Sequence, residues 1–304
     1  MLKQRVLTAI VLGAVFIALL FFAPPWLWCA FLTLVCGLAA WEWGGLSRYS
    51  ATGRIVCGMA FALLYVLIVL FMGLHQHMDR LFVDSHRVLA LLAALVTVLW
   101  LFVVPLWLRQ KWLLTSRPWA PVLVGLLVLL PPFVALTVLR HLLQPAGVLC
   151  LLALVWVADS AAYFSGRAFG RHKLAPTVSP GKTWEGAAGA VLGVLCVALL
   201  LWWLWGSHTG LWQGQPAVVR LMLFLLSVLL LVVISIAGDL FESLLKRQAD
   251  IKDSSHLLPG HGGILDRIDS LTAVLPYALA VILLAGAPLS DVAAMAAGML
   301  HTFF

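Results

Sequence analysis

The sequence predicts an all-α, polytopic integral membrane protein with about nine transmembrane helices and a cytoplasmic N-terminus. The chain has 304 residues, of which 63% are hydrophobic, and its mean hydropathy of +1.08 lies far outside the range of soluble domains. Apolar runs of roughly 20 residues, the length that crosses a bilayer, recur along the chain. These runs are continuous rather than alternating, which favours helices over the strands of a β-barrel.

Nine apolar runs are separated by charged residues and turn residues. They cover approximately residues 6–23, 26–46, 55–74, 88–108, 119–139, 146–166, 185–206, 218–241 and 271–290. The first run begins like a signal peptide, but it is long and ends in Phe-Phe-Ala-Pro-Pro-Trp instead of a small-residue cleavage site, so we interpret it as a retained helix. The Pro24-Pro25 pair, the Pro131-Pro132 pair and the last run are the places where this count could change by one.

The basic residues are distributed unequally between the two ends of these runs. With the N-terminus inside, 15 of the 19 Lys and Arg residues fall on inner segments, and Arg80, Arg87, Arg140 and Arg220 fall on outer ones. Cytoplasmic loops carry such an excess of positive charge. The net charge of +7 is therefore mainly a signal of topology, and no nucleic-acid partner is needed to explain it.

Acidic residues concentrate in the second half of the chain, because the first five runs contain only Glu42. We therefore divide the chain into residues 1–145, a scaffold with roles in lipid access or oligomer contacts, and residues 146–304, a catalytic region. Acidic side chains at membrane depth are functional candidates because their burial is costly. Asp159, Glu185, Asp239 and Glu242 all lie near the inner ends of their runs; reaching the headgroup region is the structural alternative for each.

Two sequence stretches near the C-terminal end could bind a metal and an anion. In "AGDLFESLLKR", Asp239, Glu242 and Lys246 share one helical stripe, and an ion pair between Glu242 and Lys246 explains those two but not Asp239. In "PGHGGILDRIDS", the glycines can point backbone N–H groups into one concavity before a helix. Asp266 and Asp269 follow on one face, where capping explains one of them and Mg²⁺ binding explains both.

A third stretch, "GRHKLAPTVSPGKTWEG", is a candidate phosphate-binding loop. Positive-inside topology accounts for some of its cations, but not for Ser179-Pro180-Gly181-Lys182-Thr183, which places hydroxyls beside an amine ahead of a helix. The spacing is not that of a Walker A motif. Carboxylates for a metal, cations for phosphate and a backbone nest on one membrane face are together typical of phosphoryl or nucleotidyl transfer.

The segment from Ser243 to Asp269 resembles the signature of the phosphatidate cytidylyltransferases, also called CDP-diacylglycerol synthases. The matching elements are Ser-x-apolar-Lys-Arg, then Lys252-Asp253, then Leu-Pro-x-His-Gly-Gly-Ile-x-Asp-Arg-Ile-Asp over residues 258–269. Residues 158–186 are similar to that family's Asp-x-x-Ala-Tyr and Ser-Pro-x-Lys-Thr-x-Glu-Gly elements, and the N-terminal runs match less specifically, through Trp41-Glu42-Trp43. Ser255 stands where many relatives have Gly.

The resemblance implies that CTP and phosphatidate react to give CDP-diacylglycerol and pyrophosphate at the cytoplasmic face of a bacterial inner membrane. It implies Mg²⁺ as the cofactor, and it leaves room for a second cation and for a homodimer. The implied metal ligands are Asp239 and Asp266, with Asp269 and Asp159 near them. The implied phosphate-binding residues are Ser179, Lys182, Thr183, Lys246, Arg247, Lys252, His261, Gly262 and Gly263. The residues implied in catalysis are Asp239, Asp266, Lys182 and Arg267.

An ion-coupled transporter is the alternative from another class, because intramembrane acids also mark ion pathways. Transporters usually place such acids near the bilayer midplane between inverted repeats. Here the polar residues gather at one membrane face and no internal repeat is visible, so we favour the enzyme.

Overall fold

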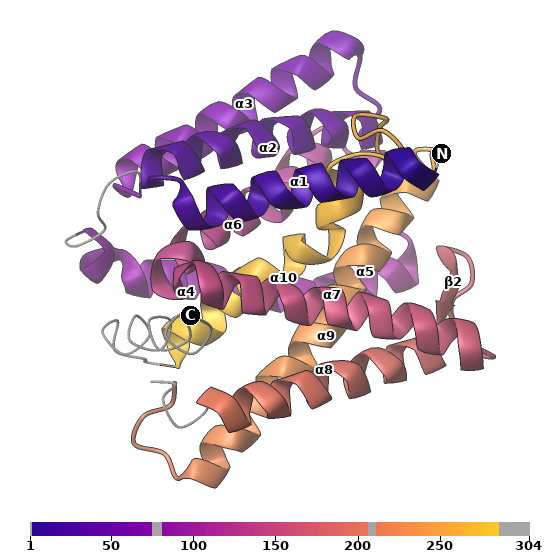
Figure 1. Ribbon diagram of the computed structural model, residues 1–304. Helices are drawn as coiled ribbons and strands as arrows, with labels where there is room; N and C mark the ends of the chain where they lie inside the picture. Colours follow the sequence, from indigo (N-terminus) through magenta and orange to yellow (C-terminus); the bar gives the residue numbers. More distant parts are fainter. Residues whose placement is uncertain (1, 75–80, 206–210, 286–304) are drawn as a thin grey trace.

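The computed structural model describes residues 2–74, 81–205 and 211–285, and these are predominantly helical (Figure 1). The α-helices are α1 (Leu2–Phe22), α2 (Pro25–Leu46), α3 (Ala51–Phe71), α4 (Leu81–Val98), α5 (Val104–Gln110), α6 (Ala120–Leu142), α7 (Gln144–Phe169), α8 (Trp184–Trp205), α9 (Ala217–Gln248) and α10 (Leu265–Leu284). A π-helical turn, η1 (Leu99–Val103), joins α4 to α5, and a 3₁₀ turn, η2 (Leu114–Ser116), precedes α6. Two short strands, β1 (Lys173–Ala175) and β2 (Ser179–Thr183), lie between α7 and α8.

The predicted fold class, an all-α polytopic membrane protein, is confirmed. Eight helical segments of the described residues are long and apolar enough to cross a membrane, and α1 contributes a shorter apolar stretch, Val6–Phe22. The number of crossings and the cytoplasmic N-terminus stay predictions. Arg80 and the end of the last predicted run, residues 286–290, lie outside the described residues.

Several predicted boundaries differ from the observed ones. The Pro24-Pro25 pair separates α1 from α2, whereas Pro131 and Pro132 lie inside an uninterrupted α6. Helix α9 continues beyond the predicted run to Gln248, and α10 begins at Leu265, before its predicted run. Charged residues end an apolar run in the sequence without ending the helix, because the backbone hydrogen bonds of a helix do not depend on side-chain hydropathy.

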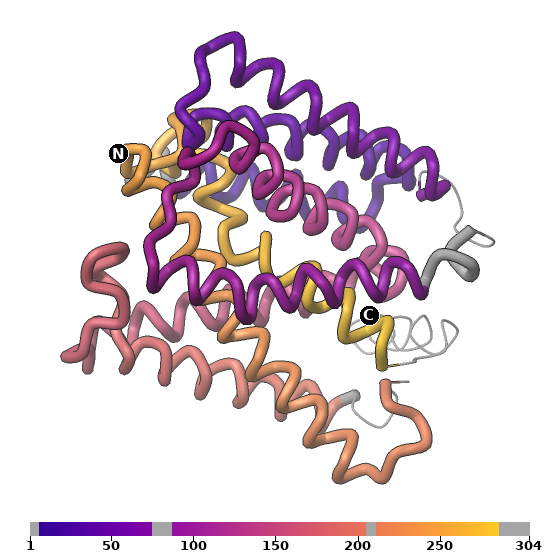
Figure 2. The backbone as a smooth tube through the Cα atoms, turned by 180° about the vertical axis from the view of Figure 1, so that it is seen from behind, coloured from indigo at the N-terminus to yellow at the C-terminus, as the bar shows by residue number. Residues whose placement is uncertain are grey.

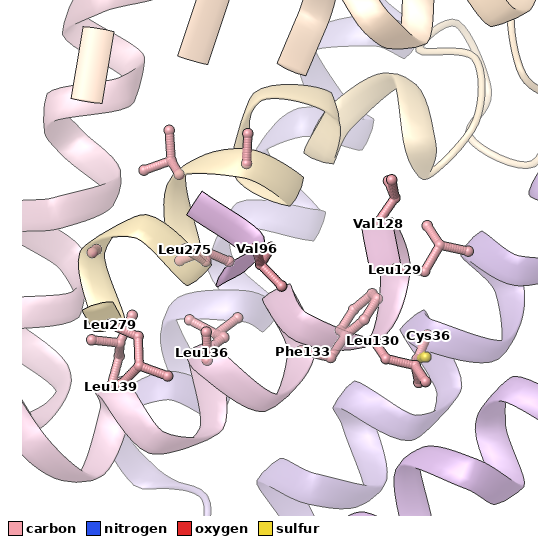
Figure 3. Packing of buried hydrophobic residues seen from close by; sticks show 14 of the residues in the cluster. Cys36, Val96, Val128, Leu129, Leu130, Phe133, Leu136, Leu139, Leu275 and Leu279 are labelled. Carbon is pink, nitrogen blue, oxygen red and sulfur yellow. The ribbon is translucent and has the colours of Figure 1, made fainter. Parts of the chain in front are cut away.

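The hydrophobic core combines residues from both halves of the chain, with α6 packed against α2, α3, α4, α7 and α10. Figure 3 shows Leu130 of α6 beside Cys36 of α2, and Leu139 of α6 beside Leu279 of α10. Leu129, Val138 and Leu139 of α6 are fully buried. The last described helix therefore packs against helices of the N-terminal half, α4 and α6, as well as against α9.

One end of the bundle, here called the hairpin end, carries the N-terminus, the β1–β2 hairpin and the connection between α9 and α10 (Figures 1 and 2). Three chain connections are tied together there. Arg48 Nη2, which follows α2, lies 2.6 Å from Asp250 Oδ2, and Gln248 Nε2 donates to the carbonyl oxygen of Trp112 at 2.8 Å. Segments far apart in the sequence therefore form one polar surface.

Candidate active site

The β1–β2 hairpin is shaped by the first residues of α8. The strands are antiparallel, with Lys173 opposite Thr183. Thr183 caps α8, because its Oγ1 accepts a hydrogen bond from the Gly186 N–H at 3.1 Å. Glu185 lies 2.6 Å from His172 Nδ1 and accepts the His172 N–H at 3.2 Å, so it fixes the chain entering the hairpin. These contacts give Glu185 a structural role and place Lys182 opposite α9.

Lys182 of the hairpin forms an ion pair with Asp239 of α9. Lys182 Nζ lies 2.6 Å from Asp239 Oδ2, and the two side chains are 23% and 31% exposed. Ser243 Oγ, one turn further along α9, donates to Asp239 Oδ1 at 3.3 Å. Asp159 of α7 and Asp269 of α10 lie close enough to Asp239 for the three charges to interact. Three carboxylates from three helices thus lie near one another, and Lys182 pairs directly with one of them.

A cavity of about 450 Å³ opens beside this ion pair, between α7, α8, α9 and the hairpin. Its polar lining residues are Asp159, Tyr163, Arg167, Ser179, Lys182, Thr183, Ser235 and Asp239. Its other wall is formed by small apolar residues such as Ala162, Ala187 and Ala190. Close packing of α7 and α8 depends on Gly186, where an added Cβ would lie 3.0 Å from the carbonyl oxygen of Ala162. The cavity therefore joins a charged end to an apolar wall.

A second charged group lies between α9 and α10 and is more buried than the Lys182–Asp239 pair. Lys246 Nζ contacts Glu242 Oε2 at 3.0 Å and Asp266 Oδ1 at 2.7 Å. The Lys246, Glu242 and Asp266 side chains are 14%, 8% and 5% exposed. The predicted pair between Glu242 and Lys246 is present, but it is buried and shared with Asp266, not solvated. Burial makes the removal of any one partner costly, because an unpaired charge would remain.

The second carboxylate oxygen of Asp266 organises the loop before α10, residues 254–264, here called the glycine loop. Asp266 Oδ2 accepts hydrogen bonds from Ser254 N at 2.8 Å, Ser254 Oγ at 3.0 Å and Gly263 N at 2.8 Å. Gly262 has φ +82°, and an added Cβ there would lie 2.6 Å from Asp266 Oδ2. The glycines allow this close approach.

The glycine loop has a different anionic partner from the one we expected. The N–H groups of Ile264 and Leu265 donate to Glu42 of α2 at 2.9 and 2.7 Å, and the Gly263 N–H donates to Asp266. The concavity predicted for a phosphate is therefore filled by carboxylates of the protein itself. Phosphate binding by Gly262 and Gly263 stays a prediction, and it requires a rearrangement of these contacts.

The structure brings together only part of the predicted site. Asp159, Ser179, Lys182, Thr183 and Asp239 line the cavity. The other predicted residues do not line it: Asp266, Asp269, Lys246, Arg247, Lys252, His261, Gly262, Gly263 and Arg267. Of these, Arg247 reaches the hairpin, where its Nε donates to the Val178 carbonyl oxygen at 3.4 Å, and Lys252 and Arg267 are exposed. Their roles in phosphate binding and catalysis stay predictions.

Two residues of this site were not singled out by sequence reasoning. Glu42 was noted as the one acid of the first five runs and as part of Trp41-Glu42-Trp43, but no role was assigned to it; its isolation among apolar residues was the available signal. Arg167 was counted only as an inner cation, although it lines the cavity and donates from Nη1 to Tyr163 Oη at 3.1 Å. Its position four residues after Tyr163, and therefore on the same helical face, was the signal for it.

The carboxylates that line the cavity fit a magnesium site that is completed by substrate. Within the described ranges, no three Asp, Glu, His or Cys side chains are arranged to hold a metal ion by themselves. Mg²⁺ usually binds through one or two carboxylates together with substrate phosphates and water. Asp159 and Asp239 supply two such carboxylates at the charged end of the cavity.

Fold and site together define a membrane-embedded protein whose polar cavity is suited to phosphate groups and opens beside an apolar wall. The cytidylyltransferase family model matches residues 3–285. The chain is 40% identical over 297 residues to a phosphatidate cytidylyltransferase of Pseudomonas aeruginosa, covering 94% of this chain and 98% of the relative. It is 39% identical over 287 residues to that of Haemophilus influenzae, covering 91% and 97%. The chain belongs to the cytidylyltransferase family, which confirms the resemblance stated above.

Proposed function

We propose that this protein transfers the cytidylyl group of CTP to phosphatidate, giving CDP-diacylglycerol and pyrophosphate. Family membership supports this, as does the name of relatives that match nearly the whole chain. The single structural observation that carries it is the cavity in which the Lys182–Asp239 pair meets an apolar wall. Such a cavity suits a substrate with a charged phosphate and acyl chains. The comparisons do not support the transporter alternative.

In the proposed reaction, a phosphate oxygen of phosphatidate attacks the α-phosphorus of CTP. The new oxygen–phosphorus bond forms as the bond from the α-phosphorus to the bridging oxygen breaks, and pyrophosphate leaves with that electron pair. The lipid phosphate is already anionic near neutral pH, so the reaction needs no strong general base. The main task of the protein is to position two anions and to stabilise the charge that spreads over the transferring group.

Different lining residues would position the two anions and stabilise the charge of the transferring group. Lys182 lies at the charged end of the cavity, where its ammonium group is placed to bind phosphate oxygens in exchange for Asp239. Ser179 and Thr183 of the same strand line the cavity beside it. Mg²⁺, held by Asp239 and Asp159 together with substrate oxygens, would supply further neutralisation of the phosphate charge. A second cation and assembly as a homodimer stay predictions.

We place the active site on the cytoplasmic side of a bacterial inner membrane. The sequence assigns 15 of the 19 Lys and Arg residues to the inner segments, and the cavity lies beside the hairpin that carries Lys173 and Lys182. Arg140, assigned to the outer side, contacts the carbonyl oxygens of Leu20 and Ala23 at the end of α1 that is remote from the N-terminus. The positive-inside rule then supports a cytoplasmic hairpin end.

Purified protein in detergent provides the direct test of this activity. Incubation with radiolabelled CTP, phosphatidate and Mg²⁺ should move the label into the organic phase as a lipid-linked CMP, and EDTA should prevent it. Omission of phosphatidate is the control for trapped nucleotide. Retention of all label in the aqueous phase, with folded protein present, would contradict the proposed function.

Arg167 is expected to bind the lipid phosphate. It lies on the α7 wall of the cavity beside Tyr163, which is 58% exposed, and three residues after Phe164, which is 67% exposed. Arg167→Gln should raise the KM for phosphatidate by about tenfold to a hundredfold, because a charge-assisted hydrogen bond is worth about 1.5–3 kcal/mol. Kinetics in mixed micelles with varied lipid fraction would measure this change.

Arg171→Gln is the matched control for Arg167→Gln. Arg171 is exposed and follows the same helix, but it does not line the cavity. Its substitution should leave both KM values within twofold. An increase in the KM for CTP alone in Arg167→Gln would assign this arginine to the triphosphate instead of the lipid.

A further inference from the structure

Glu42 of α2 is a buried carboxylate at the centre of the glycine loop. It is 0% exposed, and four donor groups lie within hydrogen-bond distance of its carboxylate, of which the Ser254 hydroxyl is shared with Asp266. The donors are Ser254 Oγ at 3.0 Å, Ser255 Oγ at 2.6 Å, Ile264 N at 2.9 Å and Leu265 N at 2.7 Å. Two of these donors are N–H groups at the start of α10, where the helix dipole favours a negative charge. Glu42 therefore holds both ends of the connection that leads into α10.

The loop is built around this carboxylate. A Cβ added at Gly263 would overlap Ser254 Oγ and lie 2.5 Å from Glu42 Oε1. Glycine at this position is therefore required by the close approach of Glu42. The loop is shaped for a permanent carboxylate from another part of the chain.

Glu42 is connected to the charged residues of α10 through Ser254. The Ser254 hydroxyl lies 3.0 Å from Glu42 Oε2 and 3.0 Å from Asp266 Oδ2, and the Ser254 N–H donates to the same Asp266 oxygen. Asp266 and Asp269 occupy the first turns of α10, and Asp269 interacts electrostatically with Asp239 and Asp159. A displacement of Glu42 would therefore shift the start of α10 and, with it, the carboxylates of Asp266 and Asp269.

We propose that Glu42 is a positioning residue for cytidylyl transfer, which fixes the first turn of α10 relative to Asp239. This inference rests on the proposed function. It assigns a part of the site to the N-terminal half of the chain, which we predicted to be a scaffold. Glu42 does not line the cavity, so it acts through Ser254 and the start of α10 and not on substrate.

Glu42→Gln tests this role, because glutamine keeps the shape but replaces one acceptor oxygen by a donor that faces N–H and O–H donors. We expect kcat to fall at least about a hundredfold, as for the loss of preorganisation at a charged site. The KM for phosphatidate should stay within twofold, because the α7 wall is not in contact with Glu42. Hydrogen exchange should accelerate at Ile264 or Leu265, because these two amides donate to different carboxylate oxygens and one of those oxygens is replaced by an NH2 group. Glu42→Asp, which keeps the charge but is shorter, should recover part of kcat.

Ser255→Ala provides a second route to the same question. It removes only one donor to Glu42, and its effect should be smaller than that of Glu42→Gln. In the double variant the two losses should not add, because both act through one contact. Arg48→Gln is the matched control, since Arg48 also connects α2 to this loop through Asp250, but in an exposed pair of 58% and 83% exposure; it should leave kcat within twofold.

The possible outcomes separate the hypotheses. Wild-type kcat in folded Glu42→Gln would overturn the positioning role, as would additive losses in the double variant with Ser255→Ala. If Glu42→Gln does not fold, Glu42→Asp and Ser255→Ala carry the same test, and unchanged kcat in both would overturn it. Inactive wild-type protein in the same assay would overturn the proposed function instead, and the hydrogen exchange of residues 254–265 would still report on the contact.

Discussion

Asp239→Asn is expected to abolish cytidylyl transfer while leaving the fold intact. Asp239 lines the cavity and pairs with Lys182 at 2.6 Å, so its loss removes a proposed metal ligand and releases the lysine that should meet phosphate. We expect kcat to fall by about a thousandfold, the upper range for the loss of one preorganised electrostatic contact. Because the pair is partly exposed, the free energy of unfolding should change by about 1 kcal/mol or less. The assay with labelled CTP and thermal unfolding in detergent measure the two effects.

Asp250→Asn is the matched control for Asp239→Asn. Asp250 lies just after the C-terminal end of α9 and pairs with Arg48, but it is 83% exposed and does not line the cavity. Its substitution should leave kcat within twofold. Retention of a tenth or more of wild-type kcat in Asp239→Asn would remove Asp239 from the catalytic residues.

Asp266→Asn is expected to abolish turnover and also to destabilise the protein. The Asp266 carboxylate is 5% exposed, pairs with Lys246 at 2.7 Å and accepts three hydrogen bonds from the glycine loop. Loss of one partner from a buried ion pair costs about 3–5 kcal/mol. If Asp266 served only as a metal ligand, as the resemblance implies, the folding of this variant would be near normal. The buried contacts change that expectation, and thermal unfolding combined with the transfer assay tests it.

Glu242→Gln is the comparison for Asp266→Asn. Glu242 shares Lys246 with Asp266, but its other carboxylate oxygen has no hydrogen-bond partner among the described residues, so its loss should lower kcat less. A wild-type unfolding temperature for Asp266→Asn would contradict the structural role assigned here. An unfolding temperature lowered equally by Asp266→Asn and Glu242→Gln would attribute stability to the ion pair and not to the loop.

The sequence was sufficient to predict most of the fold because a bilayer imposes a simple rule. A chain that crosses hydrocarbon must satisfy its backbone hydrogen bonds within a helix and present apolar side chains, and both demands are visible in hydropathy. The β1–β2 hairpin was not predicted, since its residues carry no alternating pattern and depend on contacts with Glu185 and Thr183. The apolar run marked the last helix only from residue 271, because Asp266 and Asp269 interrupt the apolar pattern, but the glycines before them placed the helix start correctly ahead of Asp266.

The site was predicted in part for a related reason. Acids near membrane depth are rare enough to attract attention, so Asp159 and Asp239 were found from the sequence. Lys182 was found from its place in the Ser-Pro-Gly-Lys-Thr loop, and the structure places all three around one cavity. The sequence does not show which charged side chains form ion pairs or hydrogen bonds with each other. Lys246 was assigned to phosphate but lies between Glu242 and Asp266, and the glycine loop was assigned to phosphate but holds Glu42. Such pairings arise from tertiary contacts across the chain.

The contact between Glu42 and Ser254 also has a consequence for biosynthesis. The two residues are 212 positions apart, and Leu265, another donor to Glu42, is 223 positions from it. At an elongation rate of about 5–20 residues per second, the ribosome needs roughly 10–40 s to make the partners after it has made Glu42. During that interval the carboxylate is without its final donors, and an unpaired acid at membrane depth is costly. Insertion of the early helices therefore precedes completion of the glycine loop, and the loop can close only when nearly the whole chain has been synthesised.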